Sequence, residues 1–103
     1  MKGMQNLMKQ AQIMQQKMTT LQKELEAREM ETSSGGGMIK IKITGKQQIV
    51  SISINKECID PNDAAGLEEL VKTAVNQAIK ESQDMVSSAM SKVTGGFNIP
   101  GMF

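Results

Sequence analysis

The first quarter of the chain carries hydrophobic residues at heptad spacing. Intervals of four and three residues alternate along this series, and the positions between are mostly Gln, Lys and Glu, which favour helix. Its members are Met4, Leu7, Ala11, Met14, Met18, Leu21 and Leu25. The pattern predicts an amphipathic helix from about Met4 to Arg28 with one apolar seam. We interpret the methionines of the seam as core filling, because Met packs well into irregular gaps.

Strict alternation of apolar and polar residues follows in the middle of the chain. Residues 38–44 (MIKIKIT) and 50–55 (VSISIN) each predict a strand with one apolar face. The residues expected on the core face are Ile39, Ile41, Ile43, Val50, Ile52 and Ile54. Because only a short turn at 45–47 joins the two strands, they are expected to pair as an antiparallel hairpin with one solvated face.

A third strand is indicated more weakly at residues 29–34 (EMETSS), and Gly35-Gly36-Gly37 then allows a tight reversal. The glycine triplet also resembles a phosphate-binding loop. Such a loop leads into a helix, whereas Met38 opens a strand, so we favour the reversal.

The second helix is expected to begin at Asp60-Pro61-Asn62-Asp63. The first Asp can cap a helix, Pro suits the first helical position, and the last Asp favours the positive end of the helix dipole. From Leu67 onward, apolar residues recur with helical period until Gly95-Gly96, where the helix is expected to end.

These elements follow the order α-β-β-β-α, which predicts an α+β fold with a three-stranded antiparallel sheet and two long helices. We expect one domain over residues 1–94 and a flexible, apolar, Gly- and Pro-containing tail at 95–103. A helix of about 25 residues is about 37 Å long, whereas a compact 100-residue domain is about 34 Å across. The excess apolar stripes must protrude or pair with a second copy. Large exposed apolar patches are uncommon on monomers, so we predict an intertwined homodimer.

Composition argues against enzymatic chemistry. The 103 residues include no His, the commonest general base and metal ligand, and the only cysteine, Cys58, therefore has no His partner. Gly45-Lys46 does not complete a nucleotide-binding loop, because Gln47 stands where Ser or Thr is required. We expect no catalytic residues, no metal site, no cofactor and no small-molecule substrate.

Lysines are distributed unevenly, although the net charge is only +1. Residues 1–23 and 32–56 each hold four lysines and no acid. The candidate DNA-binding residues are Lys2, Lys9, Lys17 and Lys23, within an arc of about 120° opposite the seam, and Lys40, Lys42 and Lys46 in the hairpin. Because no aromatic residues lie among them, the phosphate backbone of duplex DNA is a better target than stacked single-stranded bases. Ordinary solvated lysines are the alternative interpretation.

Several segments together resemble the YbaB/EbfC family of bacterial nucleoid-associated proteins. They are LMKQAQ at 7–12, GGGMIKI at 35–41, IDP at 59–61, LEEL at 67–70, AVNQA at 74–78 and TGGFNIPG at 94–101. The resemblance implies a homodimer joined through its sheets, with projecting helices and little sequence preference on DNA. It also implies a role in nucleoid organisation or gene regulation. The turn at 44–48 departs from the family pattern of Asn-Gly and a second glycine, which leaves the turn type open.

Two other binding functions fit the pattern. Helix, hairpin and helix is also the plan of prefoldin, so a prefoldin-like chaperone or an interaction scaffold without DNA binding is the main alternative. A basic amphipathic helix can also lie on a membrane, but this one lacks an aromatic anchor. No apolar run approaches a membrane span, and the N-terminus is too polar for a signal peptide. We therefore expect a cytoplasmic protein at the nucleoid with no membrane partner.

Overall fold

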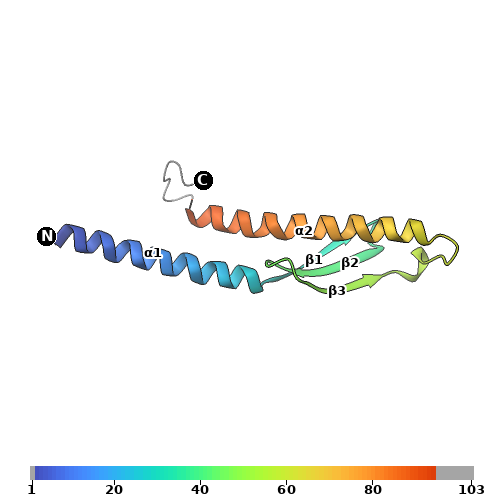
Figure 1. Ribbon diagram of the computed structural model, residues 1–103, viewed down its shortest axis with the longest axis horizontal. Coiled ribbons are helices and arrows are strands. Elements are labelled where there is room, and N and C mark those ends of the chain that lie inside the picture. Colours follow the sequence, from blue (N-terminus) through green and yellow to red (C-terminus); the bar gives the residue numbers. More distant parts are fainter. Residues whose placement is uncertain (1, 95–103) are drawn as a thin grey trace.

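The computed structural model describes residues 2–94, which form two long helices and one sheet (Figure 1). The elements are α1 (Lys2–Ala27), β1 (Glu29–Ser34), β2 (Ile39–Thr44), β3 (Ile49–Ile54), a 3-10 turn (Lys56–Cys58) and α2 (Ala64–Thr94). This order confirms the predicted α-β-β-β-α arrangement. The predictions for the tail at 95–103 lie outside the described residues.

The sheet is antiparallel, with β2 between β1 and β3. Ile41 of β2 lies opposite Thr32 of β1 on one side and opposite Ile52 of β3 on the other. The β2–β3 register shifts between Lys42 and Ile43. The glycine triplet forms the β1–β2 reversal with φ values of 63°, 68° and 91°, the left-handed region that glycine adopts without strain.

The core lies between α2 and the first two strands. The isoleucines of β2 are buried, and the small side chains of Ala74 and Ala78 let the helix backbone approach them closely. The buried core side chains are Ile39, Ile41, Ile43, Ala74 and Ala78. The alternation in β2 therefore predicted its buried face correctly.

The predicted core face of β3 is correct for Ile52 and Ile54, which lie opposite Ile41 and Ile39, but this face is not fully covered. Val50 is 50% exposed and Ile52 is 43% exposed, while Ile54 is half-buried. Ile52 lies opposite Ile41 in the register, so the two residues share the core-facing side of the sheet. A helix about 10–12 Å wide covers about two strands spaced about 4.8 Å apart, and α2 covers β1 and β2. The apolar residues of β3 remain beside the helix without cover.

The predicted start of the second helix is wrong. Asp60 and Pro61 form a turn, in which the Asp60 carboxylate accepts a hydrogen bond from the Asn62 backbone amide at 2.9 Å. The helix begins at Ala64, and the Asp63 carboxylate caps it by accepting from the Gly66 amide at 3.1 Å. Both aspartates suit a cap, but Asp60 is used in a local Asx turn.

The end of α1 is fastened to the β2–β3 turn. The Gly45 amide donates to the Arg28 carbonyl at 3.0 Å, and the Lys46 amide donates to the Glu26 carbonyl at 3.2 Å. From the other side, the buried Ser82 hydroxyl on α2 donates to the Thr44 carbonyl at 2.6 Å. These bonds set the direction in which α1 leaves the sheet.

Gly45→Ala is expected to destabilise this joint. A Cβ at Gly45 would meet the Leu25 carbonyl oxygen at 1.9 Å, so backbone must move. Overpacking of this kind costs about 1–3 kcal/mol, which urea unfolding at fixed protein concentration would measure. Gly3→Ala is the matched control, since nothing lies within 4 Å of its Cβ and Ala favours helix. Equal unfolding midpoints for the two variants would show that the close approach at Gly45 carries no stability.

The molecule is elongated, with extents of 75 × 23 × 17 Å, because α1 projects beyond the sheet (Figure 1). The apolar seam of α1 is at least partly covered from Met14 to its C-terminal end and uncovered before it. Leu25 is buried and Leu21 is half-buried, whereas Leu7 is 66% exposed and Met4 is 63% exposed. Within residues 2–94, no single-chain contact covers the tip of the seam.

Candidate nucleic-acid interface

The outer face of α1 presents three lysines of the first predicted set. Lys9, Lys17 and Lys23 are all exposed, and Lys2 is the first residue of the helix. The helix holds Lys9 and Lys23 on one side, because fourteen residues make nearly four turns. This face projects from the sheet and carries no acid before Glu24.

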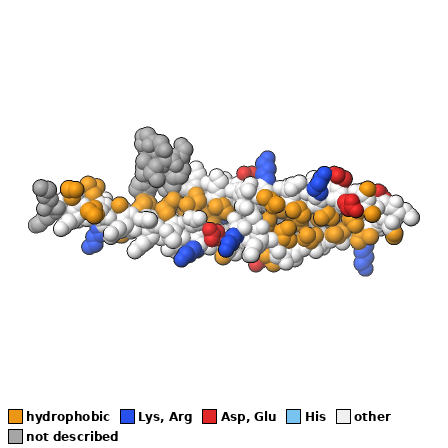
Figure 2. All heavy atoms as spheres, viewed as in Figure 1, with side chains coloured by type: hydrophobic (Ala, Val, Ile, Leu, Met, Phe, Trp, Pro, Cys, Tyr) orange, Lys and Arg blue, Asp and Glu red, His pale blue; other side chains and the backbone are white. Residues whose placement is uncertain are grey.

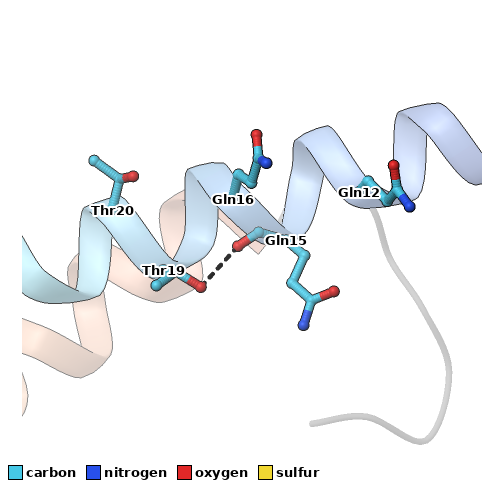
Figure 3. A pocket seen from close by; sticks show the side chains of 5 residues that line it. All are labelled: Gln12, Gln15, Gln16, Thr19 and Thr20. Carbon is cyan, nitrogen blue, oxygen red and sulfur yellow. Dashed lines mark hydrogen bonds between the residues drawn. The ribbon is translucent and has the colours of Figure 1, made fainter.

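Glutamine and threonine side chains line the flank of this lysine face. They border a shallow depression of about 720 Å³ (Figure 3) and are Gln12, Gln15, Gln16, Thr19 and Thr20. Gln16 lies seven residues from both Lys9 and Lys23, so the three side chains leave the helix in similar directions. Glutamine can donate to phosphate oxygens. We name Lys9, Gln12, Gln16, Lys17 and Lys23 the α1 polar face.

The sequence predicts a basic, Gln-rich outer face on this helix, but no glutamine is among the predicted DNA-binding residues. The signal for the glutamines was present in the seven-residue spacing of Lys9, Gln16 and Lys23, but glutamine is also a common neutral surface residue. Thr19 is engaged within the helix, where its hydroxyl donates to the Gln15 carbonyl at 2.9 Å (Figure 3).

The hairpin lysines occupy a different electrostatic setting. Lys40 and Lys42 are exposed on the side of β2 opposite the buried isoleucines. Lys42 lies across from Glu31 of β1, whereas Lys40 lies between Ser33 and Ser53. The neighbouring carboxylate offsets part of the positive potential at Lys42, whereas Lys40 has no acid directly across from it.

Lys46 connects the two predicted lysine sets. It is exposed in the β2–β3 turn, and its backbone amide donates to Glu26 at the end of α1. Lys23 lies one helical turn before Glu26. The fold therefore brings Lys46 to the base of α1 and leaves Lys40 and Lys42 on the sheet.

Other sites are sparse in the described part of the chain. Among residues 2–94, no three Asp, Glu or Cys side chains are grouped as metal ligands. No helix in this range is long and apolar enough to cross a membrane. Cys58 is half-buried and its thiol donates to the Asn55 carbonyl at 3.0 Å.

The sequence profile of the YbaB/EbfC DNA-binding family matches residues 1–97. The chain belongs to this family. A nucleoid-associated protein of Clostridium kluyveri is 53% identical over 101 residues, which are 98% of this chain and 89% of that protein. A nucleoid-associated protein of Desulforamulus reducens is 51% identical and is 96% covered, again with 98% of this chain.

A solved structure shares the fold of this YbaB/EbfC family member. The uncharacterized protein HP0035 from Helicobacter pylori superposes with a TM-score of 0.62, covering 81% of this chain and 87% of that one at 18% identity. The family is a DNA-binding family and not an enzyme family. This confirms the family resemblance and the prediction of a non-enzymatic DNA-binding role.

Proposed function

We propose that this YbaB/EbfC family member is a cytoplasmic nucleoid protein that binds duplex DNA as a homodimer, mainly through the phosphate backbone. Its role would be in nucleoid organisation or gene regulation. The observation that carries the proposal is the α1 polar face, which places exposed lysines on a helix projecting beyond the sheet.

The dimensions of this face suit a duplex. Lys9 and Lys23 are fourteen residues apart, so they are separated by about 21 Å along the helix. Duplex DNA carries about twelve phosphate charges over that length of its axis, at one charge per about 1.7 Å. Gln12 and Gln16 add neutral donors between the cations. Such contacts position a protein on DNA and carry no sequence information directly.

The homodimer is supported by the uncovered apolar side chains of β3. Ile49, Val50 and Ile52 are all exposed, as is the nearby Ile59. Hydrophobic side chains gather over the sheet end of the molecule in Figure 2. β3 is also an edge strand, whose outer backbone groups can pair with a second chain. A second copy at this surface would shield the isoleucines and present two α1 polar faces to one duplex.

Salt dependence tests the phosphate mechanism. If about four to six lysines of a dimer engage phosphates, log K should fall linearly with log salt with a slope of about −3 to −5. Titrations of one duplex by fluorescence anisotropy at several salt concentrations give this slope. Scrambled competitor DNA should compete nearly as well as any chosen sequence. A slope near zero would rule out backbone binding.

Binding of unfolded client proteins, as a chaperone does, is the second candidate function. The exposed apolar side chains at the tip of α1 favour it. Met4, Leu7 and Met8 are exposed there, and Met-rich surfaces adapt to varied apolar partners. Suppression of aggregation of an unfolded client, without a gel shift on duplex DNA, would support the prefoldin-like alternative over DNA binding.

A further inference from the structure

The outer edge of β1 is open along most of its length. β1 pairs only with β2 within the described sheet. The Arg28 carbonyl accepts a hydrogen bond from the Gly45 amide, so the backbone groups of Arg28 point toward β2. Because antiparallel ladders alternate, the backbone groups of Glu29, Glu31 and Ser33 point away from β2. Gln77 of α2 closes one end by donating to the Ser33 carbonyl at 3.2 Å.

A groove of about 420 Å³ runs between this open edge and α2. Its apolar lining comes from Met30 of β1 and Met85 of α2, both half-buried. Its acidic side chains on the α2 side are those of Glu81 and Asp84, whereas Glu31 lines the groove from the edge strand with its side chain on the other face of the sheet, beside Lys42. Met residues at the base suit side chains of varied shape.

The charges of the groove are of one sign. Glu81 and Asp84 are three residues apart and therefore lie on one side of α2, and no Lys or Arg is among the described residues that line the groove. The only cation directly opposite a lining acid in the ladder is Lys42, across from Glu31. The α2 side of the groove thus presents two carboxylates that no lining cation offsets.

We propose that this groove binds a basic, extended segment of another protein as a fourth strand on β1. The backbone of the segment would pair with the outward groups of Glu29 and Glu31, which is strand addition to a free sheet edge. Alternate side chains of an added strand point to one face. Lysines or arginines at these positions would place their charged ends at Glu81 and Asp84 and their methylene stems on Met30 and Met85.

The occupant is identified by complementarity. A Lys- or Arg-rich disordered tail carries the positive charge that complements the carboxylates of the groove. Such tails are common interaction segments. The β3 edge, by contrast, is flanked by isoleucines and Val50, which suit an apolar partner surface. Acidic residues at a sheet edge can also serve to keep other strands away, and the experiment below distinguishes that role.

A labelled peptide of about ten residues tests the proposal, with Lys at alternate positions and Val and Thr between. Fluorescence anisotropy with the full-length protein should show saturable binding. The double variant Glu81→Lys with Asp84→Lys should weaken it about tenfold or more. The control with Glu57→Lys and Glu68→Lys has the same net charge, and its two positions lie outside the groove. It should bind as the wild type does.

Backbone pairing has its own control. The same peptide carrying N-methyl groups on the amides of alternate residues keeps its charge but loses ladder donors, so its binding should be lost. Equal weakening by the two double variants, or unchanged binding of the methylated peptide, would overturn the proposal. No binding of the unmodified peptide would also overturn it and leave edge protection as the role of the acids. Circular dichroism of each variant confirms folding.

Discussion

Replacing Lys9, Lys17 and Lys23 together by Glu is expected to abolish binding to plain duplex DNA. Each substitution changes the charge by two units, so the net charge of the chain falls from +1 to −5. The field of α1 reverses where the phosphates are proposed to lie. A gel-shift titration at low salt measures the loss. Surface substitutions usually cost little stability, so sedimentation should show the same oligomeric state as the wild type.

The matched control is the hairpin variant Lys40→Glu, Lys42→Glu and Lys46→Glu. It makes the same change in net charge, but Lys42 already lies beside Glu31. We therefore expect weaker binding and not its loss. If the hairpin variant fails to bind while the α1 variant binds normally, the assignment to α1 is wrong. If both bind normally, the DNA surface lies elsewhere, for example on α2.

The regular elements of this fold were predictable because their periodicity is local. The seam of α1 and the alternation of β2 follow from residue order alone, and α1 ends within a residue of its predicted end at Arg28. The weak strand at 29–34 was also correct. Neither outcome depends on distant parts of the chain.

Burial of β3 could not be predicted in the same way. The sequence of β3 alternates as that of β2 does, yet Ile41 is buried and its neighbour Ile52 is not. The difference lies in the width of α2 relative to three strands, which is a property of the packing. The helix start failed for a related reason, since Asp60 and Asp63 are equally good caps by sequence.

The candidate sites differ in the same way, because some depend on local spacing and others on tertiary packing. The lysines of α1 share a helix, so helical spacing placed them. The approach of Lys46 to Glu26 depends on a backbone bond between the β2–β3 turn and α1. The acidic groove joins Glu31 to Glu81, fifty residues apart in sequence, across a packing interface. Sequence spacing contains no signal for such pairs.

The second large effect is expected for the proposed dimer, in the variant Ile52→Asp. The wild type should sediment at low micromolar concentration with about twice the chain mass of 11.2 kDa. Burial of an isoleucine contributes about 1.5–3 kcal/mol, and a two-fold interface contains each substitution twice. The dimer should therefore weaken by at least about 100-fold, and the variant should sediment near the mass of one chain.

Ile13→Asp is the control, because Ile13 is also an exposed isoleucine but lies on α1, away from β3. It introduces the same carboxylate and should leave the dimer intact. Circular dichroism should show folded helices in both variants, since neither residue belongs to the buried core. A wild-type monomer at this concentration would contradict the dimer itself. A dimer that survives Ile52→Asp and dissociates with Ile13→Asp would instead place the interface along α1, on the face that carries Ile13.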